Sequence, residues 1–232
     1  MKRTALHASV ALGVIALGLS ACSSSSNHSS STNGSALLGT FHITAGTCSG
    51  PTVSGSFFRM VQSGGTVASG PFVANGDSTC STKTYSPLSP GTDGGLTTGS
   101  YQTQPNPPFD SSKNGVADAI IEPVKFFAVN FAVSTNQTDP QTSKKVPAPS
   151  IAYANGTLTG NVEALSVAWN GQQFNQGAPK PGGGLPGNTK VLTGTYDSNT
   201  GAYTLEWSSQ IVGGPFNGFT GVWHLDGTFS KK

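Results

Sequence analysis

Charged side chains are scarce in this sequence of 232 residues. Lys, Arg, Asp and Glu make up 9% of it, whereas about 25% is usual for a soluble domain. Lys2 and Arg3 lie in an expected leader, and removing these two of the 12 basic residues leaves 10 against 10 acidic residues. A neutral chain without a basic cluster lacks the charge that holds nucleic acid phosphates. We therefore expect no nucleic acid partner.

Catalytic motifs are also missing. The chain has four histidines, of which His7 and His28 precede the expected folded domain, so that only His42 and His224 remain within it. No Gly-x-Ser-x-Gly motif, zinc-ligand spacing or glycine-rich phosphate loop is present. His224 and Asp226 lie two residues apart on one face of a predicted strand, where they could form an orienting pair. A hydrolase that uses His224 is therefore a hypothesis, and it is the weakest of those that we consider. We expect a protein that is not an enzyme.

Helical periodicity is the third absence. No segment of 12 or more residues carries an apolar helical stripe free of Gly and Pro. Period-two alternation is frequent instead, and the 31 glycines and 15 prolines suit short strands joined by tight turns. We predict an all-β fold, an antiparallel meander forming a β-barrel or β-sandwich with short helical turns at most. Residues 37–232 are expected to form it as a single domain.

The C-terminal third carries the clearest strands. The dipeptide Asn170-Gly171 matches a two-residue type I′ hairpin turn, which needs positive φ at both positions. A Pro/Gly-rich loop over 178–188 is expected on the surface. In the last predicted strand Gly221 and Gly227 separate large apolar residues, as a strongly coiled sheet requires. The expected strands are 158–164, 166–169, 172–174, 191–197, 202–212 and a final strand whose inner face carries Phe219, Trp223, Leu225 and Phe229.

The remainder of the domain is less regular. In the N-terminal third we expect strands over 41–44, 55–61 and 69–73. Prolines exclude regular central strands from much of 101–149. Within that stretch, 126–133 is expected to form one buried strand and 116–122 a short helix.

The first residues have the three parts of a secretory signal. A basic start precedes the apolar run 8–19, which is shorter than the roughly 20 residues of a membrane span. The run ends in Leu19-Ser20-Ala21-Cys22, which resembles the lipobox of bacterial lipoproteins. This resemblance implies that residues 1–21 are a signal peptide and that Cys22 is acylated. It also implies a location outside the cytoplasm, anchored in the cell envelope, in the outer membrane if the organism has one.

A tether is expected behind the lipid. Residues 22–36 begin with the lipidated cysteine and continue as an almost uninterrupted run of Ser, Thr, Asn and Gly. Such segments behave as flexible coils because they carry too little apolar surface to fold. The membrane is therefore the one partner that the sequence predicts.

Cysteine is rare, with three residues in the chain. If Cys22 carries lipid, Cys48 and Cys80 remain as an even pair in an oxidising compartment. We expect a disulfide between them.

One segment has the spacing of a calcium loop. It runs from Asp110 through Ser112 and Asn114 to Asp118, with Gly115 at the sixth position. Oxygen ligands at positions 1, 3, 5 and 9 are typical of calcium-binding loops, in which the glycine permits the sharp turn. Ile121 stands where a bidentate Glu is usual, and an Asn-Gly turn in which Asp118 caps a short helix is the alternative. Calcium is the only cofactor that we consider.

Aromatic residues supply the remaining hypothesis. Trp169, Trp207 and Trp223 lie in predicted strands, where they could line a ligand cavity, although their alternation with other apolar residues favours a packed core. The segments 192–198 and 167–169 resemble pieces of avidin-type barrels, in a different order along the chain, and no biotin site is transferred. The C-terminal segments Phe174-Asn175-Gln176-Gly177 and Gly213-Gly214-Pro215-Phe216, with Trp223-His224-Leu225, are similar to exported bacterial proteins of unassigned function.

These observations favour an envelope lipoprotein whose β domain is a non-enzymatic binding or structural module. The alternative is a lipocalin- or avidin-like barrel that carries a small apolar ligand. That alternative predicts a cavity of several hundred Å³ lined by the aromatic face, on the order of usual ligand pockets.

Overall fold

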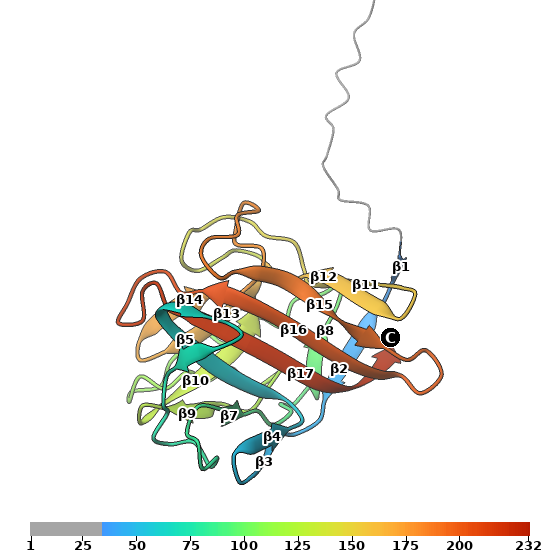
Figure 1. Ribbon diagram of the computed structural model, residues 1–232. Helices are drawn as coiled ribbons and strands as arrows, with labels where there is room; N and C mark the ends of the chain where they lie inside the picture. Colours follow the sequence, from blue (N-terminus) through green and yellow to red (C-terminus); the bar gives the residue numbers. More distant parts are fainter. Residues whose placement is uncertain (1–33) are drawn as a thin grey trace, which may run out of the picture. The chain divides into compact units, whose positions relative to one another are not determined.

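The computed structural model describes residues 34–232, which form an all-β domain (Figure 1). No helix occurs within these residues, and accordingly none of them belongs to a helix long and apolar enough to cross a bilayer. Every strand pairing is antiparallel. The predicted fold class is confirmed.

An 11-stranded curled sheet forms the larger part of the domain (Figure 1). Its main path runs β1-β11-β12-β15-β16-β17-β2-β8. The strands of this path are β1 (Ser35–Ala36), β11 (Ser150–Ala154), β12 (Thr157–Asn161), β15 (Lys190–Tyr196), β16 (Ala202–Gln210), β17 (Thr220–Lys231), β2 (Gly39–Ile43) and β8 (Gly95–Thr97). The remaining three, grouped around β17, are β5 (Phe57–Thr66), β6 (Gly70–Phe72) and β7 (Ser86–Pro87).

One segment near the start of the domain supplies both the first strand of this order, β1, and the last but one, β2. Residues 35–36 pair with β11, and Gly39–Ile43 pairs with β17. Neighbouring residues of one short segment therefore pair with two strands, β11 and β17, that lie far apart in the order of the curled sheet. Its concave side is filled by large side chains that are almost completely buried, among them Phe41, Leu96, Leu158, Leu192 and Leu205.

Two smaller sheets complete the domain. The four-stranded sheet has the order β14-β13-β10-β9, with β14 (Gln172–Asn175), β13 (Leu165–Trp169), β10 (Val129–Thr135) and β9 (Val124–Phe126). Side chains of this sheet and of the curled sheet belong to one hydrophobic core. A two-stranded sheet consists of β3 (Thr47–Ser49) and β4 (Thr52–Ser54), and the disulfide between Cys48 and Cys80 confirms the predicted pair.

The C-terminal strands were predicted in the main correctly. β15, β16 and β17 form a meander, and the Asn170-Gly171 turn has φ values of 49° and 71°, as a type I′ turn requires. Trp207 stacks on its cross-strand partner Trp223, and both are buried. Phe219 lies before the last strand, not in it.

The prediction that the strands between 158 and 197 form one continuous meander is wrong. β12 lies beside β15, whereas β13 and β14 belong to the four-stranded sheet. The chain crosses between the sheets at residues 162–164, which are all buried. The meander is therefore interrupted by a hairpin that covers the core from the other side.

Two predictions in the middle of the chain are wrong. The interval 126–133 holds a hairpin, with β9 and β10 joined at Phe127 and Ala128, instead of one strand. Residues 116–122 contain no helix. Residues 119–120 form a bend, Ile121 forms a bridge with Pro90, and both Ile120 and Ile121 are buried in the core.

Candidate functional site

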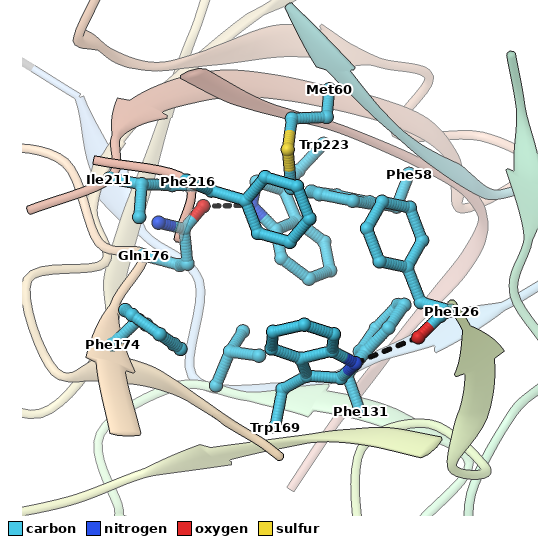
Figure 2. Close-up of a pocket in the computed structure, with 11 residues that line it drawn as sticks. Phe58, Met60, Phe126, Phe131, Trp169, Phe174, Gln176, Ile211, Phe216 and Trp223 are labelled. Carbon is cyan, nitrogen blue, oxygen red and sulfur yellow. Dashed lines mark hydrogen bonds between the residues drawn. The ribbon is translucent and has the colours of Figure 1, made fainter. Parts of the chain in front are cut away.

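An aromatic cavity lies between the curled sheet and the four-stranded sheet (Figure 2). Its volume is about 40 Å³. Ten of its wall residues are apolar and one is polar. They are Phe58, Met60, Phe126, Phe131, Val167, Trp169, Phe174, Ile211, Phe216 and Trp223, with the amide Gln176.

Strand alternation places these side chains in the wall. In β5 Phe58 and Met60 are buried and line the cavity, whereas Phe57 and Arg59 are only half-buried. Trp223 lies on β17 directly opposite Phe58 and packs against its ring at a centroid distance of 4.7 Å. The facing sheet contributes the rings of Phe126 and Phe131, each within 6 Å of the Phe58 ring. The wall is thus built from rings that contact one another edge to face or tilted, an arrangement that aromatic pairs favour.

The polar atoms of the wall are satisfied. Trp169 donates its indole N–H to the carbonyl oxygen of Phe126 at 2.8 Å. Trp223 donates to Oε1 of Gln176 at 3.4 Å, and Gln176 Nε2 donates to the carbonyl of Asn175 at 3.1 Å (Figure 2 shows the first two bonds). Gln176 is therefore the one side chain of the wall through which a bound molecule could exchange a hydrogen bond.

A glycine-rich turn brings Phe216 to the cavity. Phe216 belongs to the loop between β16 and β17, in which Gly213, Gly214 and Gly218 have φ between 65° and 84°. The half-buried ring of Phe216 packs on Trp169 at 5.4 Å and on Phe126 at 5.9 Å. Because the loop tip is exposed while this ring is inserted, Phe216 closes the cavity on the side of the loop.

The mouth beside Phe216 is apolar as well. Phe127, at the tip of the β9–β10 hairpin, is 45% exposed and its ring lies 5.7 Å from that of Phe216. Val212, in the same loop as Phe216, is 51% exposed. Large apolar side chains beside a cavity are common around ligand entrances.

The cavity is smaller than a carrier requires in the conformation described. An apolar cavity of about 150 Å³ holds one benzene molecule and stays free of water. With about 40 Å³ the cavity has room for a methyl-sized group. A larger guest would need the ring of Phe216 to move outward.

The predicted calcium ligands are only partly brought together. Asp110 accepts hydrogen bonds from the backbone N–H groups of Ser112 and Asn114 and from the side-chain amide of Asn114. The hydrogen bonds with Asn114 hold the pKa of Asp110 below its ordinary value. Asp118 is exposed, and its carbonyl accepts from Thr92 instead. Within residues 34–232 no three His, Cys, Asp or Glu side chains gather as a metal site would need.

The two histidines of the domain lie on the outside of the curled sheet. His224 Nδ1 lies 2.8 Å from Oε1 of Glu206, its cross-strand neighbour, so that its partner is not Asp226. The ring stacks on Phe57 at 4.7 Å, and the bond from His224 lowers the pKa of Glu206. His42 Nε2 lies 2.8 Å from Oγ of the exposed Ser230. Neither histidine joins a nucleophile and a carboxylate in one hydrogen-bonded chain among the contacts of the described part of the molecule.

The lipidation residue Cys22 lies outside the described residues. Of the three tryptophans, Trp169 and Trp223 line the cavity, and Trp207 lies one strand further away, with its N–H bonded to the carbonyl of Gln176. The prediction from sequence missed the phenylalanines of β9 and β10 and Phe216 as wall residues. The glycine-rich turn around Phe216 was the available signal, since a large ring between positive-φ glycines has few reasons to lie in an exposed loop.

No protein-family model matches this chain, and no curated protein and no solved structure matches it either.

Proposed function

We propose that this chain is a lipid-anchored protein of the bacterial cell envelope whose β domain binds a small apolar molecule. The observation that carries the binding role is the aromatic cavity between the two sheets, closed on one side by Phe216. Lipidation of Cys22 supplies the anchor, and the Ser-rich segment that follows supplies the tether. No chemistry on the bound molecule is part of this proposal.

The wall defines the class of ligand. Ten of its eleven residues are apolar, so a charged ligand would lose its hydration without compensation. Once the ring of Phe216 moves outward, a ring or a short branched chain could pack against the edges and faces of the surrounding aromatic residues. A single hydroxyl or carbonyl on that ligand could be met by Gln176, whose amide lies in the wall.

The Phe216 loop is the moving part of this proposal. Its glycines tolerate the backbone changes that a swing of the loop needs. Its bonds to the rest of the domain are few, one of them from the exposed side chain of Gln141 to the carbonyl of Val212. Opening would expose Trp169 and Phe126 to the incoming ligand.

Toluene is a suitable probe because it has one ring and no charge. Its binding can be followed by the chemical shifts of the Trp169 and Trp223 indole N–H groups, both of which report on the cavity wall. We expect toluene to shift these two signals saturably and to leave that of Trp207 less affected. In Phe216→Ala the cavity is already open, and we expect association to be about tenfold faster, equivalent to roughly 1.4 kcal/mol of barrier.

The matched control is Phe219→Ala. Phe219 belongs to the same loop and contacts Phe216 at 5.6 Å, but does not line the cavity. Its loss should leave association unchanged. If toluene perturbs neither the wild-type protein nor Phe216→Ala, the cavity is a packing defect and the binding role is wrong.

A further inference from the structure

A second buried site lies directly behind the cavity wall, at the end of β14. Phe174 and Gln176 line the cavity, whereas Asn175 between them belongs to a cluster of polar side chains. Asn175 is 3% exposed, Asp139 1% and Lys180 9%. An amide, a carboxylate and an amine are thus enclosed together, independently of whether the cavity binds a ligand.

The side-chain amide of Asn175 is held at both ends. Its Nδ2 donates to Oδ1 of Asp139 at 2.9 Å and to the carbonyl of Glu163 at 2.8 Å. Its Oδ1 accepts the backbone N–H of Gly177 at 3.0 Å. The amide nitrogen therefore faces a carboxylate, and the amide oxygen faces a donor that would stabilise negative charge developing on it.

Lys180 brings an amine to the same residue. Its Nζ donates to the backbone carbonyl oxygen of Asn175 at 2.6 Å. Burial lowers the pKa of this amine to about 7, against the opposing effect of Asp139. A substantial fraction of Lys180 is therefore neutral near neutral pH, and a neutral amine is the nucleophilic form.

Asp139 is placed to transfer a proton to the side-chain nitrogen of Asn175. Its other oxygen, Oδ2, accepts the N–H and the hydroxyl of Thr142 at 2.7 Å and 2.8 Å, which fixes the carboxylate beside the amide nitrogen. A carboxylate held at hydrogen-bond distance from a leaving nitrogen is placed as a general acid–base group.

We propose that Lys180 and Asn175 become joined by an amide bond between their side chains. Nζ of neutral Lys180 attacks Cγ of Asn175 and forms the new C–N bond. The bond from Cγ to Nδ2 breaks, and Asp139 carries a proton from Nζ to Nδ2, which leaves as ammonia. The reaction consumes no oxidant, reductant or co-reactant, because one amine and one primary amide yield one secondary amide and ammonia.

The crosslink would fasten the chain immediately behind the cavity. It ties the end of β14 to the start of the loop over 178–188, and Gln176 lies between its two ends. Gln176 would then keep a fixed position for its bonds to Trp223 and Trp207. This consequence holds with or without a ligand in the cavity.

Mass spectrometry of the full, folded chain tests the crosslink. Trypsin should release the fragment from Val146 to Lys190, since Lys180 is followed by Pro181. We expect this fragment to be lighter than calculated by one ammonia and to resist fragmentation between residues 175 and 180. Lys180→Arg, which retains a long cationic side chain, should restore the calculated mass. The matched control Lys144→Arg changes an exposed lysine that contacts Pro181, and it should keep the deficit.

Two outcomes would overturn the proposal. One is a wild-type fragment with its full calculated mass. The other is a deficit that persists in Lys180→Arg and permits fragmentation between residues 175 and 180, which would identify a cyclic imide at an asparagine of this fragment instead. Asp139→Asn supplies the test of mechanism, because we expect it to slow the reaction at least about a hundredfold if proton transfer by this carboxylate contributes as general acid–base groups usually do. The mass of the wild-type protein decides the matter even if these variants fail to fold.

Discussion

Gln176 is the residue at which the apolar cavity and the buried polar cluster meet. Its Oε1 accepts from Trp223, and its Nε2 donates to the same carbonyl of Asn175 that accepts from Lys180. It fits because Gly221, opposite, has no side chain: a Cβ there would lie 2.1 Å from Oε1 of Gln176. The glycine was predicted as a bend in a coiled sheet, and the structure assigns it the further role of making room for this amide.

Lys180 gives a pH-dependence that can be measured when no crosslink is possible. In Asn175→Ala the amine remains buried and its backbone acceptor is kept. In the unfolded chain the Lys180 amine has its ordinary pKa of about 10.5, whereas burial in the folded chain lowers this pKa to about 7. Between these values the unfolded state binds more protons, so stability rises with pH. Below pH 7 both states are protonated, and the cost of burying the charge is constant.

We therefore expect the free energy of unfolding of Asn175→Ala to increase from about pH 7 to about pH 9, by up to about 1.4 kcal/mol per pH unit, relative to Asn175→Ala/Lys180→Met. Urea titrations of the two proteins at several pH values measure this difference. Parallel curves would show that Lys180 is not buried as a titrating amine.

Among the elements, the two-residue hairpin turns show how far local chemistry specifies this fold. Asn155-Gly156 and Asn170-Gly171 both have positive φ at each position, and these dipeptides suit a type I′ turn. Phe127 and Ala128 join β9 to β10 with φ of 49° and 64° although neither residue favours that region. Because neither residue indicates a turn, the hairpin was missed and one strand was predicted over 126–133.

Ala128→Gly should accordingly stabilise the protein. Glycine adopts positive φ without the clash of a Cβ, and the gain expected is about 1 kcal/mol, measured by urea unfolding. Gly156→Ala is the matched control at the corresponding position of another hairpin: no atom lies within 4 Å of the added Cβ, so its loss of stability reports backbone strain alone. A destabilised Ala128→Gly would mean that the Ala128 methyl makes contacts that outweigh the strain.

At the scale of the whole molecule, the disulfide joins two parts of the domain that are distant along the chain. Cys48 lies in the β3–β4 hairpin, and Cys80 follows 32 residues later in an irregular segment. Replacing both cysteines by serine should lower the free energy of unfolding by about 3–4 kcal/mol, since the unfolded chain regains the freedom of that loop. Chemical denaturation of the variant and of the oxidised wild type measures the difference. An unchanged midpoint would show that the bond contributes no net stability.

The proposed lipid anchor is the other prediction that concerns the whole molecule. Cys22→Ala removes the thiol that we propose as the site of lipidation. We expect the variant to lose incorporation of labelled palmitate and to leave the membrane fraction, because acyl chains anchor through about 0.8 kcal/mol per buried methylene. Cys48→Ser, which leaves Cys22 intact, is the control and should remain labelled. Palmitate incorporation that persists in Cys22→Ala would refute the lipobox interpretation.

The sequence by itself determined what depends on neighbours along the chain. Alternation and turn residues specified the all-β class, most C-terminal strands and the Asn170-Gly171 hairpin, and two cysteines specified their bond. Tertiary structure decided what depends on which strands lie side by side. Where the chain leaves the curled sheet at 162–164, the alternation shifts by one residue between Ala164 and Leu165. A bulge within one sheet would give the same shift, so the sequence alone could not reveal the second sheet. The cavity between the sheets and the cluster of Asp139, Asn175 and Lys180 exist because that sheet packs where it does.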